Sequence, residues 1–225
     1  MSSGERSVAH RARLLASGQD ADVFLRPDGL LVKRNRDGRG LDPEAELMRY
    51  LRERGIPVPR VHGVEDEGLV MEYIPGPRMS VELDRRPWRA AALGRQLAEL
   101  HHRLDDVPAP DFLPGSPRGA VLHLDLHPGN VVLGPDGPVV IDWACAARGD
   151  RRVDLALSWL AMAVGKLRPV RRAARARLVR SFLAGVDDAV RQAMPVAAEI
   201  RLARHDRDPD EVRAVEELVE RCRRG

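Results

Sequence analysis

The sequence has few cysteines, and they are not spaced as a disulfide scaffold or a thiolate metal site would need. Only Cys145 and Cys222 occur among the 225 residues. A chain of this length can bury a sizeable core without cross-links, and isolated cysteines are typical of a reducing compartment. The cysteine content therefore excludes a small disulfide-rich secreted domain and favours a cytoplasmic protein.

Long hydrophobic runs are also missing. The most apolar window, Leu155 to Val164, has about half of the ~20 residues that a membrane-spanning helix needs. The N-terminal stretch MSSGERSVAHRARLL contains neither an apolar core nor a cleavage pattern, so we expect no signal peptide. We expect a cytoplasmic globular protein without a membrane partner, in which residues 155–164 form a buried helix.

Lysine is nearly absent. Of the 37 basic residues, 35 are arginine and only Lys33 and Lys166 are lysine. The 34 acidic residues leave a net charge of +3, so the pI of 9.3 is weak evidence for a nucleic-acid partner, and we expect none. Because arginine is used almost everywhere else, Lys33 in the short apolar strand GLLVKR is a candidate functional residue.

Turns and short β-like runs dominate the first third of the chain. Residues 21–34 are typical of a hairpin with PDG at its turn, and residues 57–74 predict two further strands around an acidic turn. Between them, residues 42–55 predict one helix, with Asp42 as its N-cap and Pro43 at its first helical position. This part predicts a small sheet with one helix.

The rest of the chain is mainly helical in pattern. The proline- and glycine-rich PGPRMS, residues 75–80, is typical of a linker. Helical spacing then predicts helices over 88–104, 153–164, 168–185, 187–202 and 209–223. We therefore expect an α+β fold of two lobes, a small N-terminal β-sheet lobe with one helix over residues 1–73 and a larger, mainly helical lobe over 74–225.

The segment VLHLDLHPGNVVLGPDGPVVIDW, residues 121–143, sets polar side chains between two runs of β-branched residues. Such groups cost stability unless they bind or react with something. The Asn130 carbonyl and the Asp142 carboxylate suit Mg²⁺, which takes few protein ligands and completes its shell with phosphate and water oxygens. Asp125 is then a suitable acceptor for the proton of a hydroxyl group. These are the parts that phosphoryl transfer needs.

The same segment resembles the catalytic loop and metal-binding segment of the aminoglycoside phosphotransferase and choline kinase family, which has a protein-kinase-like fold. HLDLHPGN matches the kinase pattern H-R-D-x-x-x-x-N at His123, Asp125 and Asn130, and IDW stands where D-F-G would. The resemblance implies ATP and Mg²⁺ as cofactors, Asp125 as catalytic base, and Asn130 and Asp142 as metal ligands. It implies transfer of the γ-phosphoryl group of ATP to a hydroxyl group.

The resemblance also implies nucleotide-binding residues in the first lobe. Lys33 would contact the α- and β-phosphates and would be held by an ion pair with Glu44. Glu46 is a second candidate for that pair, but the family's distance to the closing Leu51 favours Glu44. The other implied contacts are Ser17 and Gly18 of the phosphate-covering loop, Val23 over the adenine, and the backbone near Glu72 and Tyr73.

The acceptor is implied to be a small molecule with a hydroxyl group. Asp154 matches a family aspartate that braces the catalytic loop, and it follows Asp142 by only twelve residues. That leaves no room for the long activation segment with which a protein kinase seats a peptide. Fifteen basic against ten acidic residues from Lys166 onward disfavour a polycationic aminoglycoside, although Asp187, Asp188 and Glu199 could line a local acidic pocket. Aminoglycoside, macrolide, amino alcohol and sugar acceptors all stay open.

Two other function classes stay open, as does the oligomeric state. In HLDLH, His123, Asp125 and His127 alternate, so on a strand they would share one face and could hold the zinc ion of a metal-dependent hydrolase. The alternative class is a non-catalytic nucleotide-binding module with a kinase-like body. Within the phosphotransferase interpretation, His123 is a structural support for the loop, and the role of His127 is ambiguous.

Overall fold

The structure is a computed structural model that describes residues 12–18, 20–65, 68–164, 172–204 and 209–224. The chain divides into two compact units. The first contains Met1–Pro75 and Val139–Ala144, and the second contains Gly76–Pro138 and Cys145–Gly225. The sequence placed the boundary after Tyr73 and assigned residues 139–144 to the second lobe, whereas the structure groups this short segment with the first unit.

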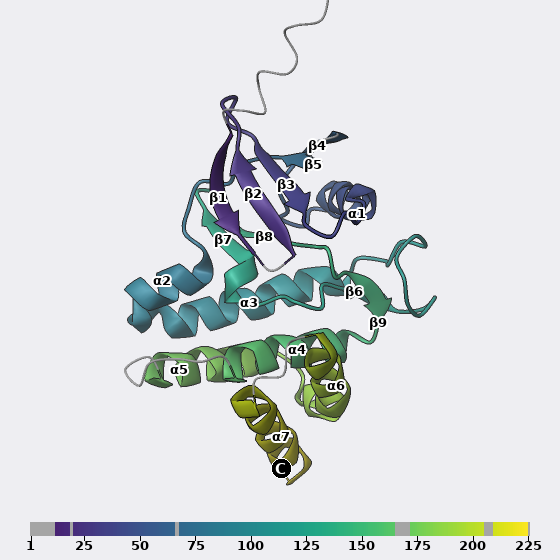
Figure 1. Ribbon diagram of the computed structural model, residues 1–225. Helices are drawn as coiled ribbons and strands as arrows, with labels where there is room; N and C mark the ends of the chain where they lie inside the picture. Colours follow the sequence, from purple (N-terminus) through teal and green to yellow (C-terminus); the bar gives the residue numbers. More distant parts are fainter. Residues whose placement is uncertain (1–11, 19, 66–67, 165–171, 205–208, 225) are drawn as a thin grey trace, which may run out of the picture. The chain divides into compact units, whose positions relative to one another are not determined.

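A five-stranded antiparallel sheet forms the body of the first unit (Figure 1), with the strand order β1-β2-β3-β5-β4. The central strand β3 pairs with β2 in the predicted hairpin, where Lys33 lies opposite Val23, and with β5, where Lys33 lies opposite Leu69. Gly29 has a φ of 85°, which lets the hairpin turn tightly. The strands are β1 (Arg13–Ser17), β2 (Ala21–Leu25), β3 (Leu31–Asn35), β4 (Val61–Glu65) and β5 (Gly68–Met71).

Helix α1 (Asp42–Glu53) packs against β4 through an apolar face that includes Leu47 and Leu51. Burial of these two leucines, 1% and 0% exposed, contributes about 2 kcal/mol each. The expectation that Asp42 caps the helix is wrong. Leu41 occupies the N-cap without a side-chain hydrogen bond, and Asp42 lies in the first turn, where its charge favours the helix dipole.

The second unit is mainly helical, as predicted. Helix α3 (Ala90–Asp105) packs along α5 (Arg172–Leu183). The two backbones come so close that a Cβ atom on Gly94 would lie 2.4 Å from the carbonyl oxygen of Leu178. The glycine is therefore required for this helix contact. The first residues of the helix predicted over 168–185 lie outside the described residues.

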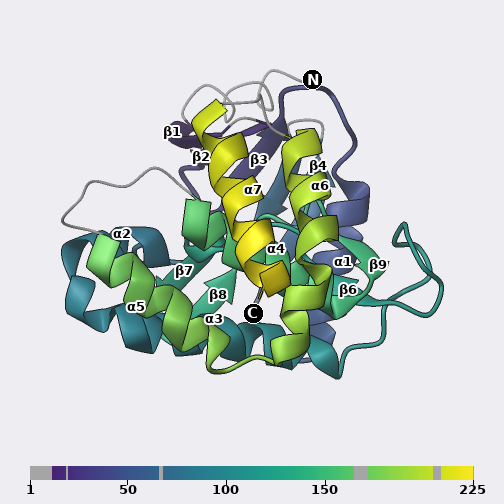
Figure 2. The same cartoon turned by 90° about the horizontal axis from the view of Figure 1, so that it is seen from below.

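Helix α4 (Arg151–Val164) contains the apolar window 155–164 and buries eight of its fourteen residues, which confirms the expected buried helix. It packs against α6 (Met194–Arg204) and α7 (Pro209–Arg224), and α6 and α7 also pack against each other (Figure 2). The helix predicted over 187–202 is divided, because a 3-10 segment, η6 (Asp188–Ala193), precedes α6.

The predicted linker over 75–80 is partly wrong, because helix α2 (Met79–Arg85) begins inside it and leads to the 3-10 segment η3 (Pro87–Arg89). Two short pairs of strands follow: β6 (Ala120–Leu122) with β9 (Ala147–Gly149), and β7 (Val131–Gly134) with β8 (Gly137–Val140), whose last two residues belong to the first unit. The 3-10 segment η4 (Pro128–Asn130) lies directly before β7.

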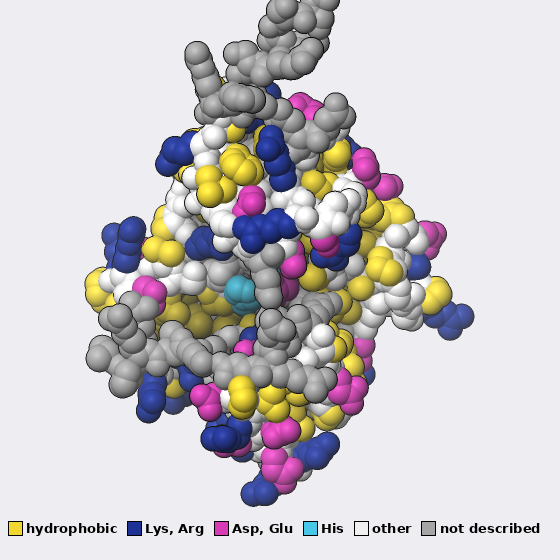
Figure 3. Space-filling model, in the orientation of Figure 1, with side chains coloured by type: hydrophobic (Ala, Val, Ile, Leu, Met, Phe, Trp, Pro, Cys, Tyr) yellow, Lys and Arg dark blue, Asp and Glu magenta, His cyan; other side chains and the backbone are white. Residues whose placement is uncertain are grey.

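The surface of α7 carries charges of both signs side by side (Figure 3). Glu220 pairs with Arg224 and approaches Arg223 on the same helix. Such pairing within one helix is typical of a solvated face. In the part of the chain that the structure describes, no helix has the length and apolar character needed to cross a membrane.

Candidate functional site

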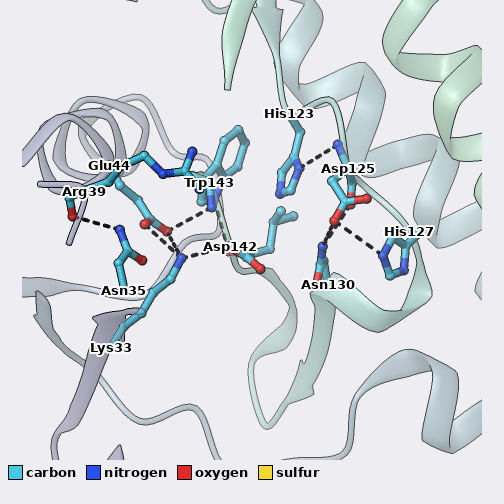
Figure 4. A network of polar contacts seen from close by, with 11 residues as sticks. Lys33, Asn35, Arg39, Glu44, His123, Asp125, His127, Asn130, Asp142 and Trp143 are labelled. Atoms are coloured by element: carbon cyan, nitrogen blue, oxygen red, sulfur yellow. Dashed lines mark hydrogen bonds and ion pairs between the residues drawn. The ribbon is translucent and has the colours of Figure 1, made fainter. Parts of the chain in front are cut away.

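Lys33 lies at the centre of a polar cluster in the first unit (Figure 4). Its Nζ atom is 2.8 and 2.9 Å from the two carboxylate oxygens of Glu44 and 2.7 Å from Oδ1 of Asp142. The central strand β3 supplies the lysine and the first turn of α1 supplies the glutamate. The structure pairs Lys33 with Glu44, and Glu46 lies on the same helix as an exposed residue.

The two carboxylates of this cluster have different environments. The side chains of Lys33 and Glu44 are 6% and 5% exposed, whereas that of Asp142 is 49% exposed. Burial alone would lower the pKa of Lys33, but the negative charges of Glu44 and Asp142 and their hydrogen bonds outweigh it and raise that pKa above its ordinary value. The lysine is therefore a fixed cation at neutral pH, with one buried and one accessible counter-ion.

Trp143 joins the segment 139–144 to this cluster. Its backbone N–H donates to Oε1 of Glu44 at 3.1 Å, and its indole N–H donates to the carbonyl oxygen of Val140 at 3.3 Å. The Trp143 side chain is 1% exposed, so it belongs to the core of the first unit. In addition, the N–H of Val140 donates to the carbonyl oxygen of Pro57 at 2.8 Å. These contacts hold Asp142 beside Lys33.

The predicted phosphate-covering loop is a short turn between β1 and β2. The N–H of Gly18 donates to the carbonyl oxygen of Ala21 at 2.9 Å. Ser17 donates from Oγ to Oδ1 of Asp22 at 2.7 Å, and Arg36 pairs with the same aspartate. The hydroxyl of Ser17 thus anchors the turn. Because its hydrogen is donated to Asp22, it is not the donor that a direct contact with phosphate would use.

The residues predicted near the adenine follow β5 or lie on β2. Val23 lies on β2, opposite Lys33 in the sheet register. The backbone N–H of Glu72 donates to the carbonyl oxygen of Arg60 at 2.9 Å, so it is already used within the sheet. The Tyr73 side chain is exposed. Within the described part of the chain, the carbonyl of Glu72 and the backbone groups of Tyr73 have no backbone partner and are available to an adenine base.

In the second unit, Asp154 holds the loop that carries Asp125. Its Oδ2 accepts from the N–H of His123 at 3.1 Å, and its Oδ1 accepts from the N–H of Leu124 at 2.6 Å. Leu124 has a φ of 63°, and Asp142 in the first unit has a φ of 67°; they are the two non-glycine residues with positive φ in the described part of the chain. Such strained positions persist where surrounding contacts impose them and often mark functional sites.

Asp125 faces the side chains of Asn130 and His127 (Figure 4). The amide nitrogen of Asn130 donates to the backbone oxygen of Asp125 at 2.9 Å and to its Oδ2 at 2.8 Å. Burial opposes ionisation of Asp125, but the nearby imidazoles of His127 and His123 and the hydrogen bond from Asn130 outweigh it and hold the pKa of Asp125 below its usual value. Asp125 is therefore an anion at neutral pH.

The donor atoms in each unit suit a hard divalent cation. Both amide hydrogens of Asn130 are engaged by Asp125, so its carbonyl oxygen is turned away from that residue. Asp142 uses Oδ1 for Lys33, and no donor to its Oδ2 is recorded among the described residues. One amide and one carboxylate oxygen match the small protein ligand set that Mg²⁺ accepts when phosphates complete its shell. Asn130 in the second unit and Asp142 in the first unit are therefore each suited to ligate such a cation.

The zinc-dependent hydrolase alternative requires that HLDLH form a strand with its three polar side chains on one face. This strand does not form. Strand β6 ends at Leu122, and the positive φ of Leu124 breaks the alternation of HLDLH. His123 uses Nδ1 to accept from the N–H of Asp125, and His127 uses Nδ1 to accept from the N–H of Gly129. In the described residues no group of three or more His, Cys, Asp or Glu side chains is arranged to hold a metal ion.

The sequence did not reveal a buried contact beneath the loop. His101 on α3 is 4% exposed, and its Nε2 lies 2.8 Å from Oγ of Ser158. Ser158 in turn donates to the carbonyl oxygen of Leu126. Burial lowers the pKa of His101 to about 4, with Asp154 as an opposing negative charge. The histidine is neutral and links α3 and α4 to the loop of Asp125.

Comparison with known proteins identifies a family and a fold. The chain matches the model of the phosphotransferase enzyme family over residues 11–115 and 104–200. It is similar to a crystal structure of the ADP-bound aminoglycoside phosphotransferase APH(2'')-Ib, with a TM-score of 0.60 and 16% identity over 93% of this chain and 92% of that chain. At this identity the likeness shows the fold alone, and it confirms the predicted two-lobed protein-kinase-like class.

Two curated relatives are similar in sequence. A probable ketoamine kinase from Thermus thermophilus is 31% identical over 164 residues, which cover 51% of this chain and 58% of the relative. A probable ketoamine kinase from Klebsiella pneumoniae is 54% identical over 41 residues, which cover 18% of this chain and 32% of the relative. The chain thus spans less than two thirds of the length of either relative.

Proposed function

Since the chain belongs to the phosphotransferase enzyme family, we propose that it transfers the γ-phosphoryl group of ATP to a hydroxyl group of a small molecule. One observation supports this most directly. Lys33 is buried as a cation between Glu44 and the half-exposed Asp142. A cluster of this kind is suited to bind the phosphates of a nucleotide and the cation that accompanies them.

The residues of the first unit have a binding role in this proposal. The Lys33 ammonium donates to oxygens of the α- and β-phosphates, and Glu44 keeps it charged and oriented. Asp142 and Asn130 would provide the protein oxygens for Mg²⁺. When bound, the cation neutralises phosphate charge and so favours in-line attack. Ser17, Gly18 and Val23 shape the turn and strand beside the nucleotide, and the carbonyl of Glu72 with the backbone of Tyr73 meets the adenine.

Asp125 has the chemical role. Its carboxylate accepts the proton of the acceptor hydroxyl as the hydroxyl oxygen forms a bond to the γ-phosphorus. The bond from that phosphorus to the bridging oxygen breaks, and ADP leaves with the electron pair. The lowered pKa of Asp125 keeps the carboxylate ionised and hence able to orient the hydroxyl and take its proton. The mechanism consists mainly of positioning and charge neutralisation.

For the acceptor we propose a ketoamine, because both curated relatives are named probable ketoamine kinases. A ketoamine presents sugar-derived hydroxyl groups, which match the alcohol that Asp125 would deprotonate. We place this activity in a reducing cytoplasm, where ATP is available, since the sequence has only two, widely separated cysteines, Cys145 and Cys222.

An acceptor panel tests this function. Purified protein with ATP and Mg²⁺ is incubated with ketoamines, aminoglycosides, macrolides, amino alcohols and sugars, and ADP release and product mass are measured. We expect ketoamines to stimulate ADP release with a product heavier by one phosphoryl group. Faster transfer to another class of compound would overturn the ketoamine as the proposed acceptor but would support the proposed phosphotransfer reaction. ATP binding without transfer to any acceptor would instead favour a non-catalytic nucleotide-binding module.

A further inference from the structure

His127 has a fixed orientation that the catalytic roles above do not use. Its side chain is 32% exposed and its Nδ1 accepts from the backbone N–H of Gly129 at 3.0 Å. A neutral imidazole that accepts at one nitrogen carries its hydrogen on the other. The contact with Gly129 therefore specifies the Nε2–H form of His127.

The second nitrogen of His127 faces the carboxylate of Asp125 (Figure 4). Nε2 lies 3.6 Å from Oδ2 of Asp125, the same oxygen that accepts from Asn130 at 2.8 Å. At 3.6 Å this is a charge–dipole contact, longer than a full hydrogen bond. Contacts of this kind around a general base often shorten when substrate binds. Two N–H groups thus converge on Oδ2, and no donor to Oδ1 is recorded among the described residues.

Gly129 is required for this orientation of the ring. A Cβ atom at position 129 would lie 2.6 Å from Cε1 and 2.9 Å from Nδ1 of His127. Because the clash involves a side chain and not the backbone, an alanine at this position would displace the imidazole while the loop stays folded. The sequence HPGN thus contains both the histidine and the space that it needs.

We propose that His127 is a positioning residue for Asp125. Its Nε2–H and the amide of Asn130 hold Oδ2, which leaves Oδ1 to accept the proton of the acceptor hydroxyl. This inference rests on the proposed phosphotransferase function. The contrasting explanation is that His127 only caps the short η4 segment through Nδ1 and contributes nothing to Asp125.

Substitutions that mimic one nitrogen at a time separate these explanations. In His127→Asn the amide oxygen takes the place of Nδ1 and keeps the cap, but the donor to Asp125 is lost. In His127→Gln the amide nitrogen takes the place of Nε2 and keeps the donor. We expect kcat to fall about 10- to 100-fold in His127→Ala and in His127→Asn, with little change in KM for ATP. His127→Gln should recover most of that loss.

The Gly129 substitution gives an independent test. Gly129→Ala should lower kcat to a similar extent as His127→Ala, because it moves the ring away from Asp125. The double variant should lose no more than either single variant, since the alanine at position 127 leaves nothing to displace. His62, an exposed residue of β4, provides the control, and His62→Ala should keep the wild-type kcat.

The outcomes distinguish failure of the inference from failure of the proposed function. If the wild type transfers no phosphoryl group to any acceptor, the function fails and the positioning role fails with it. If the wild type is active and His127→Asn keeps kcat while His127→Gln loses it, His127 is only a cap and the inference alone is overturned. NMR of ¹⁵N-histidine-labelled protein should show the Nε2–H tautomer of His127, and the Nδ1–H tautomer would overturn the inference as well.

Discussion

The Nζ atom of Lys33 lies 2.7 Å from Oδ1 of Asp142, although the two residues are 109 positions apart in the chain. This ion pair brings the end of the 121–143 segment into the first unit, next to the strand that carries the lysine. Glu44 completes the cluster from α1. The one described lysine thus pairs with two carboxylates, of which Glu44 is buried and Asp142 is accessible. Because their environments differ, substitutions in this cluster should lower the free energy of unfolding by different amounts.

Removal of the lysine should destabilise the protein strongly. Lys33→Met leaves the Glu44 carboxylate buried without a cation, which costs about 3–5 kcal/mol. The double variant Lys33→Met/Glu44→Gln removes both charges and keeps an acceptor for the N–H of Trp143, so it should recover most of that loss. Asp142→Asn, which removes the half-exposed partner, should cost about 1 kcal/mol or less. Urea unfolding measures all three, and a double variant as unstable as Lys33→Met would contradict the buried-charge explanation.

Gly68 should be indispensable because of its contact with Lys33. It has a φ of 130°, and a Cβ atom would lie 2.2 Å from the carbonyl oxygen of Lys33. Gly68→Ala should therefore reduce the free energy of unfolding by more than about 2 kcal/mol and raise KM for ATP, since β3 must shift. Gly63 on the neighbouring β4 has open space around it and an ordinary φ. Gly63→Ala should change the free energy of unfolding by about 0.5 kcal/mol or less, and equal effects of the two substitutions would refute this.

The buried His101 should make stability depend on pH. Burial lowers its pKa from 6.5 to about 4, so between these values the unfolded chain binds a proton that the folded chain excludes. Stability from this residue is fully present above about pH 6.5 and is lost as the pH falls toward 4, by an amount on the order of 3 kcal/mol. Urea unfolding at a series of pH values between 4 and 7 measures the slope.

A matched variant isolates the contribution of His101 from that of the carboxylates. His101→Gln keeps a donor to Ser158 but does not titrate, so its free energy of unfolding should vary less steeply with pH over the same range. Identical slopes for the wild type and this variant would show that His101 is not the group that titrates.

The loop that brings Asp125 and Asn130 together could be predicted from the sequence because its information is local. The spacing of Asp125 and Asn130 within one loop, and the apolar runs on either side, do not depend on the rest of the chain. The hairpin of β2 and β3 and the long helices could be predicted for the same reason, since turn residues and periodicity specify them.

Features that depend on distant contacts could not be predicted. The strand expected through HLDLH is broken at Leu124, whose backbone is held by Asp154 from 30 residues further along the chain. The place of Asp142 in the first unit depends on Pro57 and Glu44, which contact its neighbours Val140 and Trp143. The sequence did not predict helix α2, because the proline and glycine directly before it are typical of a linker.

The division of labour between Asp125 and Asp142 is tested most directly by isothermal titration of Mg-nucleotide, combined with turnover, in Asp125→Ala and Asp142→Ala. The account predicts that Asp125→Ala binds Mg-ATP like the wild type but loses acceptor phosphorylation by about 100-fold or more. It predicts that Asp142→Ala binds Mg-nucleotide much more weakly. Undiminished turnover in Asp125→Ala would contradict it.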